Sequence, residues 1–189
     1  NARAFPFAQA RAIVRGMANE AIEINRAPVL CLWASVVARR LGFKKDEALS
    51  LARVITGLTA QAKGQRIGIF RPSEKSPAEI RKAAAAKDIE VALMGRNIPC
   101  QIEGDDIRAL AKGKPVSPES AQKYLESKFG EDLEAAREAM EKLAKSYKPK
   151  DLADKAFGLY EKFRPNVPQG QKGWGAKGTL SLKTIRELG

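Results

Sequence analysis

The chain has no histidine, and this absence removes the side chain that most often carries acid–base catalysis near neutral pH. Without imidazole there is no Ser–His or Cys–His nucleophile pair and no imidazole ligand for a metal ion. Only carboxylates, Lys, Tyr and Cys remain as candidates for catalysis. We therefore expect a protein that is not an enzyme and that uses no metal or cofactor.

Cysteine is also scarce, because the chain contains only Cys31 and Cys100. Two cysteines are too few for a disulfide framework. Cys31 lies between Leu30 and Leu32, where burial would raise the pKa of the thiol and make it inert. We expect both residues to be free, buried thiols in a cytoplasmic protein.

The sequence lacks any uninterrupted apolar run of about 18 residues, which excludes a membrane-spanning helix and predicts a soluble protein without a membrane partner. Residues 1–16 precede the first methionine, Met17, and contain three Arg and no acidic residue. They are interpreted as a leader or presequence remnant outside the fold. Residues 17–164 are then an α-rich globular domain, and residues 165–189 are a Gly- and Pro-rich basic tail that ends in a short helix.

What the sequence does have is positive charge, with a formal net charge of +12. Residues 1–75 carry 13 basic and 5 acidic side chains, residues 165–189 carry 4 and 1, and the residues between carry 17 and 16. Clustered Lys and Arg bind nucleic acid favourably because they release the counterions that are condensed on its phosphates. The charge therefore predicts a nucleic acid as partner, provided that folding brings the two basic ends together.

A buried helical hairpin is predicted at the centre of the fold. Pro28 and Gly42 are typical of the start and the end of a helix over residues 28–41, and its apolar residues cover nearly every direction. A second helix is expected from about Asp46 to Gly64. The fold class is therefore predicted to be mostly α, a helical domain around this hairpin.

A small two- or three-stranded β element is expected beside the helices. Residues 89–94 and 98–102 form a predicted β-hairpin, with Pro99 placing its second strand at a sheet edge, and residues 66–70 form a short strand. The acidic group Glu103, Asp105 and Asp106 is interpreted as the N-cap of a further helix. The other expected elements are helices over 78–88, 118–129 (capped by Ser117), 131–147, 149–163 and 181–188, with irregular chain over 164–179.

Residues 34–54 also fit a helix-turn-helix. Ala38 and Gly42 have the required spacing of four, and apolar residues occupy the positions that lock one helix across the other. Asp46 and Glu47 oppose a DNA-reading role, because carboxylates in the first turn of the second helix would repel phosphates. A helix-turn-helix and an ordinary packed hairpin both remain open.

Phosphate contacts are expected from cations at the hairpin turn, beside residues 66–70 and in the glycine-rich run 170–178. In that run Ala176 stands where a Walker loop requires lysine, and Trp174 would stack on a base. The alternative function is a protein-interaction or homo-oligomeric assembly module. The predicted nucleic-acid-binding residues are Arg39, Arg40, Lys44, Lys45, Lys63, Arg66, Arg71, Lys172, Trp174 and Lys177.

Three runs of the sequence, residues 23–43, 58–70 and 172–178, resemble a family of uncharacterised bacterial proteins described as hypothetical. The resemblance extends from about Met17 onward. It implies a bacterial cytoplasmic setting and Met17 as the start. It implies no activity, cofactor or functional residue.

Overall fold

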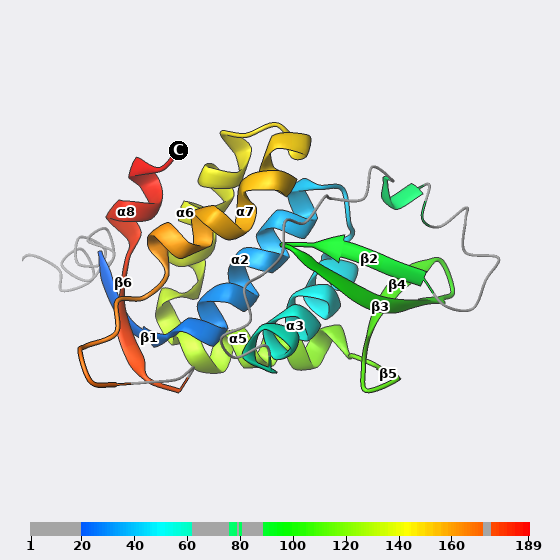
Figure 1. Cartoon of the computed structure of the whole chain (residues 1–189), viewed down its shortest axis with the longest axis horizontal. Helices are drawn as coiled ribbons and strands as arrows, with labels where there is room; N and C mark the ends of the chain where they lie inside the picture. Colours follow the sequence, from blue (N-terminus) through cyan, green and yellow to red (C-terminus); the bar gives the residue numbers. More distant parts are fainter. Residues whose placement is uncertain (1–19, 62–75, 79, 81–88, 172–174) are drawn as a thin grey trace, which may run out of the picture.

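The predicted helical hairpin is present at the centre of the protein. The computed structural model describes residues 20–61, 76–78, 80, 89–171 and 175–189 (Figure 1). Helix α2 (Arg26–Arg40) packs against helix α3 (Lys45–Gln61), and Gly42 in the turn between them has φ +105°, a conformation that favours glycine. The expected leader, the strand over 66–70 and most of the helix over 78–88 lie outside the described residues.

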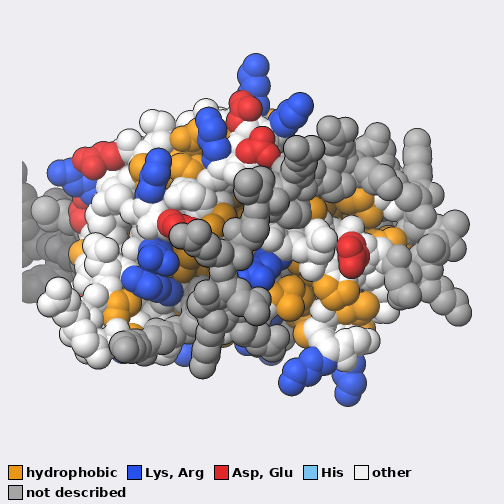
Figure 2. Space-filling model, viewed as in Figure 1, with side chains coloured by type: hydrophobic (Ala, Val, Ile, Leu, Met, Phe, Trp, Pro, Cys, Tyr) orange, Lys and Arg blue, Asp and Glu red, His pale blue; other side chains and the backbone are white. Residues whose placement is uncertain are grey.

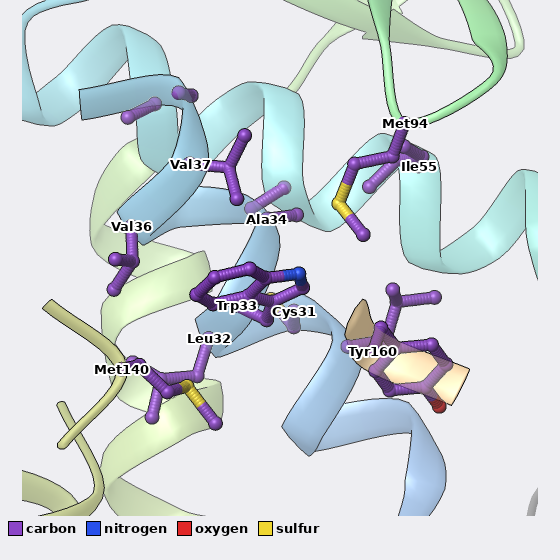
Figure 3. Packing of buried hydrophobic residues seen from close by; sticks show 14 of the residues in the cluster. Cys31, Leu32, Trp33, Ala34, Val36, Val37, Ile55, Met94, Met140 and Tyr160 are labelled. Carbon is purple, nitrogen blue, oxygen red and sulfur yellow. The ribbon is translucent and has the colours of Figure 1, made fainter. Parts of the chain in front are cut away.

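Helix α2 is buried on all sides over residues 28–38, as its apolar sequence predicted, and Trp33 is its largest fully buried side chain (Figure 3). The indole Nε1 of Trp33 donates a 2.8 Å hydrogen bond to the carbonyl oxygen of Ala156 on helix α7 (Pro149–Phe163). Its ring meets the ring of Phe163 edge-on, with 5.3 Å between the centroids. The hairpin is therefore anchored to α7 by a polar bond within an apolar core.

Two further helices, α5 (Pro118–Phe129) and α6 (Leu133–Lys145), lie against the hairpin. The Ser117 hydroxyl caps α5 by accepting a 3.3 Å hydrogen bond from the backbone N–H of Ser120. A short 3-10 turn over Gly130–Asp132 separates the two helices. The bounds of α5 and α7 match the predicted helices, because a proline marks the start of each. Helix α6 lies within the predicted range 131–147 and is two residues shorter at each end.

The β-sheet is larger than expected. Strands β2 (Ile89–Leu93), β3 (Arg96–Glu103), β4 (Asp106–Ala111) and β5 (Lys114–Pro115) form an antiparallel sheet in that order. The predicted helix from Asp105 is therefore wrong, and the predicted N-cap role of Glu103, Asp105 and Asp106 falls with it. The fold is a mixed helix-and-sheet structure rather than a mostly α one.

Tight turns produce this sheet. Both central residues of the β2–β3 turn, Met94 and Gly95, have positive φ (48° and 77°), and so do Lys112 and Gly113 (50° and 76°) between β4 and β5. Positive φ at both positions is typical of the two-residue turns whose twist matches that of a β-hairpin. The sheet is thus a series of hairpins built from local contacts.

Pro99 does not lie on an edge strand, because β3 has β2 on one side and β4 on the other. However, β4 pairs with β3 only from Cys100 onward, whereas Pro99 lies opposite Glu90 of β2. Pro99 therefore occupies the part of β3 that has a single neighbouring strand. At this position its missing N–H removes no hydrogen bond to β4.

Helix α3 is joined to the sheet through two buried polar side chains. The Glu47 carboxylate accepts hydrogen bonds from the backbone N–H of Lys44 (2.9 Å) and from that of Ile107 on β4 (2.7 Å). The Ser50 hydroxyl accepts one from the N–H of Ala109, also on β4 (3.2 Å). The first two turns of α3 therefore satisfy two backbone donors of the sheet.

The two ends of the described chain meet in a second, two-stranded sheet. Strand β1 (Ala21–Asn25) pairs antiparallel with strand β6 (Lys177–Ser181). Residues 177–179 were expected to be irregular, so this part of the prediction is wrong. A Cβ at Gly178 would lie 2.6 Å from the carbonyl oxygen of Asn166, which explains glycine there. Helix α8 (Leu182–Glu187) follows, as predicted.

Among the helices that the structure describes, none has both the length and the apolar character needed to cross a membrane.

Candidate basic cleft between helices α2, α3, α5 and α6

The hairpin turn brings together three of the predicted nucleic-acid-binding residues. Arg39 and Arg40 form the last turn of α2, where the negative end of the helix dipole favours positive charge, and Lys45 begins α3. The Arg39 guanidinium donates a 3.3 Å hydrogen bond across the turn to the carbonyl oxygen of Phe43. The fold thus holds these cations beside one another.

Helix α6 supplies two more cations, which are not among the predicted nucleic-acid-binding residues. Arg137, Glu141 and Lys145 are spaced by four residues and form one stripe of the helix. Arg137 also forms an ion pair with Glu134, with 2.7 Å between its Nη1 and the carboxylate oxygen. The spacing is visible in the sequence, but only the packed structure shows that this stripe borders the end of α2.

Two adjoining hollows lie between these helices, and together with their lining we call them the basic cleft. The larger, of about 330 Å³, is bordered by α2 and α6, and the smaller, of about 190 Å³, also reaches α3 and α5. Val36, Arg39 and Glu141 line both hollows. The described charged residues of the cleft are one carboxylate, Glu141, and the cations Arg39, Arg40, Lys45, Arg137 and Lys145.

Two polar atoms at the basic cleft are buried without a hydrogen-bond partner in the described structure. They are Nε of Arg40 and Oε1 of Gln122. One end of the Arg40 guanidinium is fixed, because Nη2 donates a 3.0 Å hydrogen bond to the carbonyl oxygen of Tyr147. Arg40 is therefore oriented by the protein while its Nε–H keeps capacity for an acceptor.

The structure does not place all the predicted contact residues in this cleft. Lys44 turns to the sheet, where its Nζ lies 2.7 Å from the Asp106 carboxylate. Lys177 pairs with Asn25 just before α2 begins, at the end of that helix opposite to Arg40 and about 22 Å away along its axis. Five predicted residues lie outside the described part of the chain: Lys63, Arg66, Arg71, Lys172 and Trp174.

The hairpin gives no support to the helix-turn-helix interpretation. Helix α3 would have to enter a DNA groove, but α2, α5 and strand β4 pack around it and residues 47–52 and 54–56 are buried. Glu47, which the sequence placed on the reading surface, is completely buried and binds the backbone of β4. The hairpin is a packing unit of the core, and its cations lie at its end.

The two cysteines do not supply a nucleophile. Both cysteines are free and buried, as expected, and burial raises the pKa of each thiol to about 12. A thiol with such a pKa is not a nucleophile near neutral pH. Among the described residues, no group of three or more Cys, Asp or Glu side chains could hold a metal ion.

Comparison of the chain with models of known protein families, with curated proteins and with solved structures finds no match. The resemblance to uncharacterised bacterial proteins therefore stays a prediction.

Proposed function

We propose that the protein binds nucleic acid without catalysing a reaction and that the basic cleft is its contact surface. Lys177 lies at the other end of α2, so the expected meeting of the two basic ends does not support this proposal. The concentration of cations in the cleft carries it instead. Five basic side chains and one acidic side chain from α2, α3 and α6 line two adjoining hollows. Such an arrangement suits a chain of phosphates rather than a single carboxylate.

The side chains present can bind phosphate in a defined way. Arg39, Arg40 and Arg137 offer planar guanidinium groups, which bind phosphate oxygens through paired hydrogen bonds. Lys145 adds positive charge to the larger hollow, and Lys45 adds it to the smaller one. These contacts are all with phosphates, so we propose binding to the sugar–phosphate backbone with little sequence preference.

A fluorescence anisotropy titration with labelled single-stranded and duplex oligonucleotides tests this proposal. We expect saturable binding at low salt. The double variant Arg39→Gln, Lys145→Gln should bind about 25-fold more weakly, because each cation contributes about 1 kcal/mol to a phosphate contact in water. Affinity should fall equally for all sequences.

The matched control carries the same charge change outside the cleft. Lys142 and Lys183 are exposed and pair with Glu138 and Glu187 on their own helices, so the variant Lys142→Gln, Lys183→Gln should keep nearly the full affinity. Equal losses in both double variants would refute a defined cleft. Absence of binding to DNA and RNA at low salt would refute the function.

A second candidate function, a homo-oligomeric assembly module, is supported by strand β2. Within the described structure, β2 is an outer strand of its sheet with β3 as its one neighbour. An edge strand can pair with the edge of a second copy. Light scattering would then show a defined oligomer, and nucleic acid would bind weakly and without saturation.

A further inference from the structure

A separate apolar groove lies on the other half of α3. It has a volume of about 550 Å³ and is bordered by α3, β3, the β4–β5 hairpin and the start of α5. This volume lies within the range of sites that hold small molecules. In Figure 2, exposed hydrophobic side chains appear between the positions of α3 and β5, with basic side chains beside β5.

The lining of the groove is apolar and positively charged. Val54 and Leu58 line it from α3, and Leu110 and Val116 line it from the side of the sheet. Among the described residues that border it, Arg53 and Lys112 are charged and none is acidic. The groove therefore combines an apolar surface with positive charge and no internal counterion.

Arg53 is the most informative residue of the groove. Its side chain is half-buried, and its guanidinium lies over the ring of Tyr124, 4.2 Å from the ring centroid. This stacking holds the guanidinium plane but uses none of its five N–H donors. In the described structure no carboxylate or carbonyl oxygen accepts a hydrogen bond from Arg53, so its donors remain available to a ligand.

We propose that this groove binds a small amphipathic carboxylate. The carboxylate group binds the Arg53 guanidinium through paired hydrogen bonds, and the apolar body lies along Val54, Leu58 and Leu110. The charge of the groove selects an anion, and its apolar lining requires a hydrophobic body. A neutral hydrophobic molecule and a small hydrophilic anion each satisfy only one of these conditions.

Isothermal titration calorimetry with decanoate, decanol and acetate tests separately the need for an anionic group and the need for a hydrophobic body. We expect saturable one-to-one binding of decanoate, at least about tenfold weaker binding of decanol, and no binding of acetate at the same concentrations. The variant Arg53→Met keeps an apolar stem without the charge and should weaken decanoate binding at least about tenfold. Lys114→Met, at an exposed residue of β5 outside the lining, should bind like the original protein.

Thermal unfolding of each variant shows that it is folded before binding is measured. Decanoate binding that is unchanged in folded Arg53→Met would overturn the proposal, because the ligand would then sit elsewhere. Equal affinity for decanoate and decanol would also overturn it. Both results are independent of nucleic-acid binding, since Arg53 does not line the basic cleft.

Discussion

Replacement of Glu47 by alanine should destabilise the protein strongly. The Glu47 carboxylate is fully buried and accepts two backbone hydrogen bonds, of 2.9 Å from Lys44 and of 2.7 Å from Ile107. A hydrogen bond to a charged group contributes about 1.5–3 kcal/mol, and Ile107 would be left with a buried, unpaired N–H. We expect the free energy of unfolding to fall by about 3–5 kcal/mol, a large part of the stability of an ordinary domain.

Urea denaturation followed by circular dichroism measures this loss. Asp46→Ala is the matched control, because Asp46 is a carboxylate in the same first turn of α3 but is exposed. Its removal should cost less than about 1 kcal/mol through the helix dipole. Glu47→Gln should lie between the two, since the amide keeps one acceptor oxygen.

Equal stability of Glu47→Ala and Asp46→Ala would refute this reasoning. It would mean that Glu47 is exposed and that α3 is not joined to β4. A helix-turn-helix with an exposed Glu47 makes the opposite prediction: removing the carboxylate would leave stability unchanged and would raise affinity for DNA.

Three further predictions concern the core. Because burial raises the pKa of both thiols from 9.0 to about 12, their contribution to the free energy of unfolding should be fully present below about pH 8 and be lost as the pH rises from there toward 12, measured by urea denaturation at increasing alkaline pH. A maleimide at neutral pH should label Cys31 and Cys100 only at the rate of unfolding, whereas labelling at the rate of a free thiol would show that they are accessible. Trp33→Phe should lower the free energy of unfolding by about 2–4 kcal/mol, because it removes the bond to Ala156 and leaves a cavity, and calorimetry would detect this loss.

The helical core could be predicted from the sequence because its signals are local. Pro28 lies in the first turn of α2, which begins two residues earlier than predicted, and Gly42 follows its end. Ser117 and Pro118 start α5, and apolar spacing marks the buried face of α6. Each of these signals acts within one or two helical turns, where sequence neighbours determine the structure.

The strands were harder to predict because their partners are distant or their turns unusual. Residues 21–25 become β1 by pairing with residues 177–181, at the other end of the chain. Strand β4 has Arg and Ala at positions where β-branched residues are more typical, so the alternation of buried Ile107 and Ala109 is a weak strand signal. The Lys112–Gly113 turn was its clearest available signal.

Only part of the basic cleft could be predicted from the sequence. Arg39, Arg40 and Lys45 are close in sequence, so any tight hairpin brings them together. Arg137 and Lys145 join them because α6 packs on α2, and the sequence does not show which stripe of α6 borders that helix. Lys177 was expected to share this surface, but pairing of β6 with β1 holds it at the other end of α2.

The salt dependence of nucleic-acid binding tests the central claim most directly. If the five cations of the cleft each contact one phosphate of a duplex, the logarithm of affinity should fall with the logarithm of salt concentration with a slope of about −4.5. The variant Arg39→Gln, Lys145→Gln should have a slope of about −2.7, and the control Lys142→Gln, Lys183→Gln should keep about −4.5. The same slope in both double variants would contradict binding through the basic cleft.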